Sequence, residues 1–531
     1  MNGHRSEAVA VLGDEILAVG SNRELESLCD SNTMRIDLQG RTILPGFNDT
    51  HVHLVGYGSA FDAVDLNEAN SISEMIQRCK DFLKEHPRKP GQWLYGRGWN
   101  QNLFEEDGQR FPTREDLDQI QEGLPVLLLR VCGHIGLAST KALEHVDVIA
   151  QTFIPGGEFD LGTDGKPNGI IREAALEWFK KNIKSNTGLD EIKQAILTGS
   201  EVLLANGITS VHTEDSYDLG YGGSFEDIHQ AYQELIEEKK LPIRIYQKIS
   251  LPKQEDIKSF LATGRRTGDG DDWYRIGPVK QWCDGTMGAR TAALLEEYSD
   301  DPGNLGILVY PEEELYENVK LAHNSDMQMC LHAIGDRALE TALNAYERVL
   351  EEFPKEHRHR IVHCQVGNLE QYKRLARLGL NINIQPLSTA VDYPIMNARL
   401  GEKREKEAHN WRTLTDLGVL ITASSDVPVE DPNVFYGVHA VVNRCNIDGD
   451  PQGGWLPEQG ITVEEALMEY TINPAIAAFE EHRKGTLVAG KLADLVILDK
   501  DPFRTPKEEL KEIKVLATMV GGEFNYEKVT R

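Results

Sequence analysis

From about residue 190 onward, amphipathic stretches of helical period alternate with short apolar runs that are typical of buried strands. An eighth apolar run lies near the start of the chain and leads into His51. Strands that alternate with helices form parallel βαβ units, and eight such units close into a barrel. The sequence therefore predicts an α/β chain built on a (β/α)₈ TIM-like barrel. The seven later runs are 207–212, 243–248, 276–282, 327–332, 360–363, 380–384 and 419–426.

Segments outside this alternation lie at the two ends of the chain and after the first barrel strand. Hairpin signals near the N-terminus, a strand signal at 34–38 and further strand signals beyond residue 480 predict a small β-sandwich domain. An inserted subdomain is expected to lie over the barrel mouth, since loops that follow barrel strands lie on that face. The expected bounds are 1–44 and 480–531 for the β-sandwich, 45–479 for the barrel and about 54–195 for the insert.

Composition excludes several classes of partner. The chain has 56 Lys and Arg against 85 Asp and Glu, and its net charge of −29 would repel nucleic acid. The sequence contains no apolar run of about 18 residues that could span a membrane, and its start lacks an apolar signal region. The 7 cysteines are scattered without a Cys-x-x-Cys pair, which suits a reducing compartment. We expect a soluble cytoplasmic protein that acts on a small molecule; a homodimer is a guess from base rates.

Polar residues with metal-binding side chains stand at the ends of the predicted barrel strands, where active sites of this fold lie. His51 and His53 point the same way, because alternate side chains of a strand share a face. Taken singly, each residue could be a buried polar group of the core. Taken together, histidines and a carboxylate at the same register favour a site for zinc or a similar divalent ion. The predicted ligands are His51, His53, Lys280, His332, His363 and Asp426.

Lys280 needs a separate argument, because a protonated lysine repels a cation. Burial disfavours the charged form, and a neutral amine can take up carbon dioxide to become an anionic carbamate that bridges two metal ions. The alternative is a charged Lys280 that pairs with Asp284 or binds an anionic substrate. The sequence leaves open whether one or two ions bind. Zinc is the default for histidine-rich sites, and manganese or iron would also fit.

This pattern resembles the amidohydrolase superfamily, with Pro-Gly-Phe-x-Asp-x-His-x-His on strand 1, a lysine on strand 4, histidines on strands 5 and 6 and an aspartate on strand 8. Within it, the chain is similar to the amidohydrolase-3 family, which includes N-substituted formamide deformylases. Two features depart from the family: Asn48 replaces an apolar residue, and the N-terminus begins late, as if a first strand were missing. The closer matches are 279–286, 332–338 and 424–429, with 130–134, 161–170 and 485–499.

The resemblance implies metal-assisted hydrolysis of a C–N bond, such as that of a small amide or an N-substituted formamide. A bound metal ion lowers the pKa of water from about 15.7 to about 7. Asp426 would take the proton of that water and deliver it to the leaving amine. His134, in the insert, would polarise the scissile carbonyl or else be structural. Hydrolysis of an ester or a cyclic amide is an alternative, as is a non-catalytic metal-binding regulator on the same barrel.

Several other side chains are candidates for binding the substrate, each with a structural interpretation beside the functional one. One group lies in the insert, where an aromatic side chain among glycines would shape a pocket or pack in a core. A histidine that ends strand 2 would face the barrel mouth, and two residues after strand 4 would hold the substrate or cap loops. These candidates are Trp99, Arg172 and Glu173 in the insert, and His212, Asp284 and Arg290 in the barrel.

Overall fold

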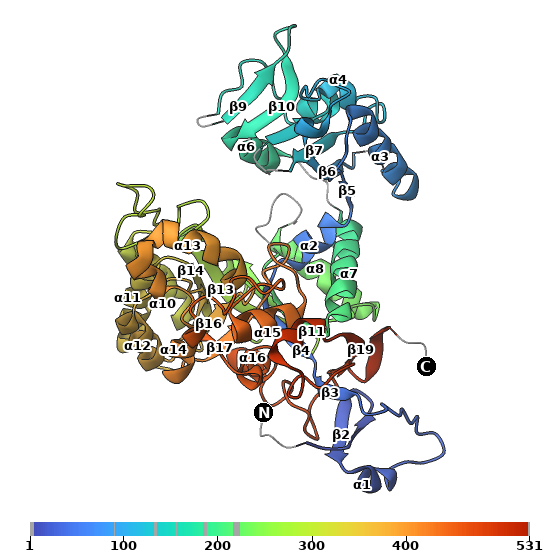
Figure 1. Cartoon of the computed structure of the whole chain (residues 1–531), viewed down its shortest axis with the longest axis vertical. Coiled ribbons are helices and arrows are strands. Elements are labelled where there is room, and N and C mark those ends of the chain that lie inside the picture. Colours follow the sequence, from blue (N-terminus) through green and yellow to red (C-terminus); the bar gives the residue numbers. More distant parts are fainter. Residues whose placement is uncertain are drawn as a thin grey trace. The chain divides into compact units, whose positions relative to one another are not determined.

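The computed structural model describes residues 5–89, 91–131, 135–154, 157–183, 188–215 and 224–528 (Figure 1). Its largest sheet contains eight parallel strands that neighbour one another in chain order. This sheet confirms the predicted barrel. Its strands are β4 (Phe47–Val52), β11 (Ile208–Thr213), β12 (Arg244–Ser250), β13 (Tyr274–Trp282), β14 (Met329–Ala333), β15 (Arg360–His363), β16 (Asn381–Ile384) and β17 (Ile421–Ala423).

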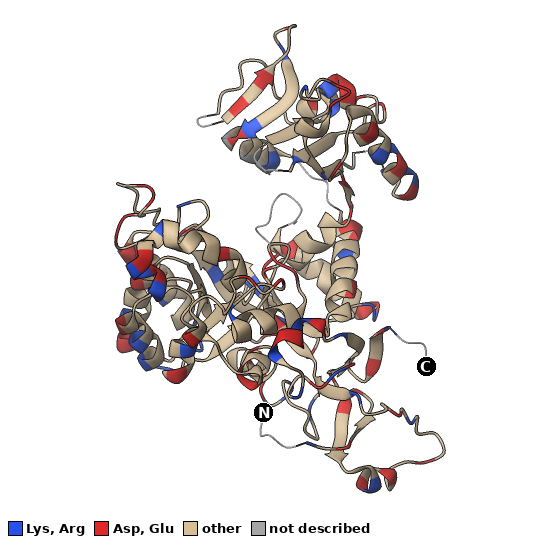
Figure 2. Ribbon diagram, in the orientation of Figure 1, with Lys and Arg blue, Asp and Glu red and all other residues tan. Residues whose placement is uncertain are grey.

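A helix precedes each barrel strand after the first. The sequence sets the helix ends, as α12 illustrates: the Asn368 side chain accepts the N–H groups of Glu370 and Gln371, and Gly379 ends the helix at φ 64°. Charged residues of both signs cover the outer helices α10 to α12 (Figure 2). The helices, in order, are α7 (Leu189–Ala205), α8 (Phe225–Glu237), α9 (Gln254–Ala262), α10 (Glu312–Asn324), α11 (Asp336–Glu352), α12 (Leu369–Leu378) and α14 (Trp411–Asp416).

Hydrogen bonds bring the last barrel strand back to the first. The Thr50 hydroxyl of β4 donates to the carbonyl of Ala423 in β17 at 2.8 Å. Just beyond the strand ends, the N–H of Asp426 donates to the carbonyl of His51 at 2.8 Å. Every residue of both strands is buried, as expected for a parallel sheet that is covered on both faces. The C-terminal end of β4 therefore lies beside the C-terminal end of β17.

Both ends of the chain contribute antiparallel strands to a small β domain. The hairpin of β1 (Ala8–Leu12) and β2 (Glu15–Gly20) matches the predicted one. Ile16, in β2, packs with Leu495 and Met519 in one apolar cluster, and its N–H donates to Lys491 at 2.7 Å. The strand predicted at 34–38 is wrong: these residues are irregular, and Met34 is 66% exposed. The second sheet runs in the order β3 (Thr42–Pro45), β18 (Leu495–Leu498), β19 (Val515–Val520) and β20 (Glu523–Glu527).

Residues 55–199 and 216–231 make up a second compact unit of the chain. Its six-stranded sheet has an apolar cluster that includes Trp99 and a second one that includes Trp93. The helices α3 (Ile72–Glu85) and α5 (Thr140–His145) each contribute buried residues to one of these clusters. The sheet order is β5 (Ala63–Asp65), β6 (Leu94–Trp99), β7 (Val126–Arg130), β8 (Ile135–Ala138), β10 (Pro167–Glu173) and β9 (Gly157–Leu161).

Two further observations bear on the setting of the protein. Among the helices in the described ranges, none combines the length and the apolar character that a membrane span requires. The cysteines in those ranges are all free thiols: Cys29, Cys79, Cys283, Cys330, Cys364 and Cys445.

Candidate metal centre

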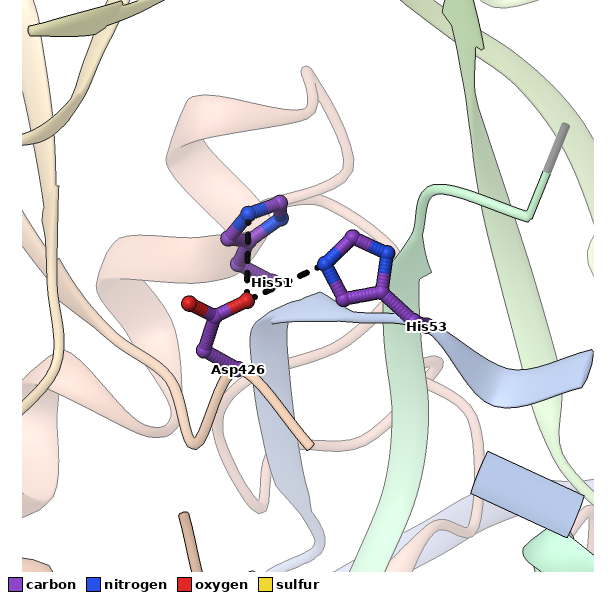
Figure 3. A group of neighbouring side chains, drawn as sticks. All are labelled: His51, His53 and Asp426. Atoms are coloured by element: carbon purple, nitrogen blue, oxygen red, sulfur yellow. Dashed lines mark hydrogen bonds and ion pairs between the residues drawn. The ribbon is translucent and has the colours of Figure 1, made fainter. Parts of the chain in front are cut away.

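His51, His53 and Asp426 converge where β4 and β17 end (Figure 3). The Oδ1 atom of Asp426 lies 3.4 Å from Nε2 of His51 and 3.2 Å from Nε2 of His53. Candidate ligand atoms of the three residues lie within 4.8 Å of one another. Two imidazole nitrogens and a carboxylate oxygen are a ligand set that zinc and similar divalent ions bind. The residues present therefore fit a divalent metal ion.

Backbone geometry places these side chains. Strand alternation in β4 directs His51 and His53 to one side of the sheet. Asp426 follows β17 with φ 55°, and His363, at the end of β15, has φ 75°. Such left-handed conformations cost an L-residue about 1–2 kcal/mol, and they cluster at functional sites because the surrounding structure must hold them in place. For Asp426, the hydrogen bond from its N–H to His51 does so.

Hydrogen bonds also fix which nitrogen of two histidines faces the centre. Nδ1 of His53 lies 2.8 Å from the carbonyl oxygen of Glu214. Because a carbonyl only accepts, Nδ1 carries the proton and the lone pair of Nε2 is left for an ion. Nδ1 of His363 lies 2.6 Å from Oε1 of Gln385, which fixes that ring in the same way. Partners of this kind orient metal-ligating histidines in proteins.

Sequence reasoning missed two buried charged residues beside His51. Glu214 follows β11, and its Oε2 lies 4.0 Å from Nε2 of His51. Lys248 lies in β12, and its Nζ is 2.6 Å from Nδ1 of His51. Both residues are fully buried, and burial lowers the pKa of Lys248 to about 8. Their positions near the C-terminal ends of barrel strands are a signal that the sequence carries. The prediction missed both residues because it considered only histidine, aspartate and one lysine at those ends.

Lys280 is paired, and its partner is Glu214 rather than Asp284. Its Nζ lies 2.7 Å from Oε2 of Glu214. Burial is the largest influence and disfavours the ammonium form, but the charge of Glu214, its hydrogen bond and further neighbouring groups together raise the pKa of Lys280. In the same pair, burial opposes ionisation of Glu214, but the charge of Lys280 lowers the pKa of Glu214 to about 2. Burial alone, the argument drawn from the sequence, therefore does not neutralise Lys280 while Glu214 faces it.

Comparison with known proteins decides the family. A profile of the amidohydrolase family matches residues 35–526. The chain belongs to the amidohydrolase family. The chain is 31% identical over 529 residues to YtcJ of Bacillus subtilis (strain 168), covering 99% of this chain and 97% of YtcJ. It is 28% identical over 544 residues to the N-substituted formamide deformylase of Arthrobacter pascens, covering 98% of this chain and 95% of that protein.

The chain also matches a solved structure over most of its length. The crystal structure of an uncharacterised metal-dependent hydrolase from Pyrococcus furiosus aligns with a TM-score of 0.78 at 29% identity. The alignment covers 93% of this chain and 95% of that chain. The barrel and its family are therefore supported by sequence and by structure.

Two further histidines lie beside the trio of His51, His53 and Asp426. The rings of His332 and His363 have centroids 4.4 Å apart, and the His363 ring lies 5.8 Å from that of His51. Nε2 of His332 lies 3.1 Å from the carbonyl oxygen of Gly285 and 3.3 Å from Oδ1 of Asp284. Five of the six predicted ligands thus lie in one series of neighbouring side chains, and Lys280 joins it through Glu214.

Other predicted site residues have structural partners. Asp284 accepts three backbone N–H groups, so it holds a loop as well as facing His332. Arg290 pairs with Asp300 at 2.9 Å, and its side chain is 36% exposed. His212 is fully buried, with Nδ1 2.7 Å from Nη1 of Arg360. Because Arg360 begins β15 rather than ending it, His212 belongs to the barrel interior below the mouth.

The candidates in the insert are placed differently. Trp99 is fully buried in the core of its own unit and donates to the carbonyl of Leu128 at 2.9 Å. That position gives no support to a pocket-lining role for Trp99. Arg172 pairs with Asp160 at 2.7 Å, and Glu173 ends β10 where α6 (Ala174–Asn182) begins. His134 lies outside the described residues.

Proposed function

We propose that this amidohydrolase is a metal-dependent hydrolase that cleaves the C–N bond of a small amide. The observation that carries the proposal is the convergence of His51, His53 and Asp426 at the C-terminal end of the barrel strands. The relative from Arthrobacter pascens, named N-substituted formamide deformylase, matches over nearly the whole chain. N-substituted formamides are therefore the first substrate class to test.

His51, His53 and Asp426 would hold one divalent ion, for which zinc is the default with this ligand set. When bound, such an ion polarises a carbonyl and lowers the pKa of water from about 15.7 to about 7. His332 and His363 would hold a second ion. A carbamate on Lys280 would replace one positive charge in a buried site with one negative charge. This change in charge would offset the charge of one added divalent ion, which supports the carbamate as part of the proposal.

Asp426 is the proposed proton carrier. One of its carboxylate oxygens faces the two imidazoles, while the other points away from them (Figure 3). The first oxygen can bind the ion, and the second is free to hold the proton of water and deliver it to the amine nitrogen as the C–N bond breaks. Positioned proton transfer of this kind contributes about 10²–10⁴-fold to a rate.

The proposal is tested on protein purified without chelators, by measuring metal per chain and formate release from a set of N-substituted formamides. We expect at least one equivalent of metal, and a loss of turnover of about 10²-fold or more in Asp426→Asn with metal retained. Two equivalents that fall to one or none in Lys280→Ala would support a carbamate-bridged pair. Full turnover in Asp426→Asn would rule out its proton role, and wild-type protein without metal would contradict the proposed metal-dependent mechanism.

A further inference from the structure

Glu214 connects three barrel strands at the candidate metal centre. Its carbonyl accepts the Nδ1 proton of His53 at 2.8 Å. Its side chain accepts from the Ser250 hydroxyl through Oε1 at 2.5 Å and from Lys280 through Oε2 at 2.7 Å. The residue is fully buried. The charge of a fully buried side chain must be compensated by neighbouring groups, so these neighbours indicate the role of Glu214.

Two carboxylates flank the same nitrogen of His51. Asp426 Oδ1 lies 3.4 Å from Nε2 of His51, and Glu214 Oε2 lies 4.0 Å from it. Zinc binds nitrogen and carboxylate oxygen at about 2.0–2.2 Å. Two ligand atoms on one ion are therefore separated by at most about 4.2 Å, which is twice the bond length. Both carboxylates lie within that limit of the His51 nitrogen.

The ion pair with Lys280 does not by itself explain why a carboxylate stands here. A buried ion pair is weak evidence for stability, because the cost of removing two charges from water offsets their attraction. A carboxylate oxygen also has lone pairs for more than one partner. Oε2 of Glu214 can therefore pair with Lys280 when no metal ion is bound and bind a divalent ion when one is present.

We propose that Glu214 is a further carboxylate ligand of the metal centre, which it joins by exchanging its ion pair with Lys280 for the ion. This inference rests on the proposed function, in which His51, His53 and Asp426 hold that ion. The exchange would free Lys280 from Glu214 when the metal is loaded. The chain would then supply a carboxylate from β11 in addition to the one that follows β17.

The test compares Glu214→Gln with Asp215→Asn in full-length protein. Glutamine keeps the shape of Glu214 and an oxygen for Ser250 but removes the charge. Asp215 is a matched control, because it is the next buried carboxylate and is bonded to Thr213 at 2.8 Å and to Tyr232 at 2.7 Å. The readouts are the affinity of metal-free protein for Zn²⁺, by competition with a chelator, and the visible spectrum of the Co²⁺-substituted protein.

We expect Glu214→Gln to lose at least about 10-fold in Zn²⁺ affinity and to change the Co²⁺ spectrum, while Asp215→Asn does neither. Wild-type affinity and spectrum in Glu214→Gln would overturn the inference and leave the proposed function intact. Wild-type protein that binds no metal would overturn both.

Glu214→Gln leaves Lys280 without its partner, and unfolding of the variant for that reason would be unrelated to metal. In that event Lys280→Gln is compared with the double variant Glu214→Gln/Lys280→Gln, in which neither member of the pair remains charged. Lower Zn²⁺ affinity in the double variant than in Lys280→Gln is the expected result. Equal affinities in the two variants would overturn the inference.

Discussion

Three histidines away from the metal centre form a hydrogen-bonded chain. Nδ1 of His359 accepts the N–H of Met329 at 2.9 Å, and Nε2 of His359 lies 2.8 Å from Nδ1 of His323. Because a backbone N–H only donates, His359 must donate from Nε2 to His323, which then donates from its own Nε2 to the carbonyl of Phe353 at 2.8 Å. Nδ1 of His357 accepts the N–H of His359 at 2.9 Å. All three rings are neutral in this arrangement.

This chain predicts a loss of stability in mild acid. Burial holds the pKa of His359 well below its ordinary value, so below about pH 6.5 the unfolded chain binds a proton that the folded chain does not. The free energy of unfolding therefore decreases as the pH is lowered, by up to about 1.4 kcal/mol per pH unit for this one group. We expect His359→Asn to lose that part of the slope in urea unfolding between about pH 7.5 and pH 5.5. Equal slopes in the variant and the wild type would contradict the account.

At the scale of elements, one carboxylate holds the loop after β13 against the start of α11. Asp284 accepts the N–H groups of Ala293 at 2.9 Å, Ile334 at 3.0 Å and Gly335 at 2.8 Å. The same carboxylate faces His332, the candidate ligand at the end of β14. The position of this loop and the orientation of that histidine are therefore linked.

Replacement of Gly335 by alanine should disturb this junction. A Cβ at Gly335 would lie 2.1 Å from the carbonyl oxygen of Ala293, which is backbone and cannot turn aside. Overpacking of this kind costs about 1–3 kcal/mol, so we expect Gly335→Ala to lower the free energy of unfolding by that amount. Gly288→Ala is the matched control, since a Cβ there meets nothing within 4 Å. Urea unfolding of the two variants gives the comparison; a loss no larger than that of the control would show that the junction can adjust.

Element-level patterns explain why the sequence predicted so much of the barrel and only part of its site. Apolar runs separated by amphipathic helices are local signals, so all eight strands were found. His51 and His53 stood out because their spacing is itself a motif. Glu214 and Lys248 carry no such local signal, because their role depends on strands that are adjacent only after folding. The strand expected at 34–38 failed for a related reason, since Met34 and Ile36 are exposed and Leu38 is the apolar residue of this stretch that packs against the cluster of the β domain.

On the scale of the whole molecule, the insert has apolar clusters of its own. The clusters around Trp99 and Trp93 are made only of residues from the insert, whereas the three candidate metal ligands His51, His53 and Asp426 belong to the barrel unit. Apolar packing within the insert therefore stabilises that unit by itself. The sequence did not reveal the core of the insert, because strands and helices do not alternate regularly there.

We expect scanning calorimetry to resolve two transitions, and zinc to raise only one of them. An ion at 100 times its dissociation constant stabilises the state that binds it by about 2.7 kcal/mol. Zinc would stabilise the barrel unit, so the temperature of the transition of the insert should be the same with and without zinc. Equal shifts of both transitions on adding zinc would show that the units unfold together.

The closure of the barrel by its first and last strands also sets an order of events during synthesis. His53 and Asp426 are 373 residues apart in the chain, so a ribosome exposes the first part of the trio long before it makes the last. No nascent or prematurely ended chain that stops before Asp426 contains the full trio. Acquisition of the ion would thus mark a completed polypeptide, and a cell could distinguish finished copies from fragments by whether they retain metal.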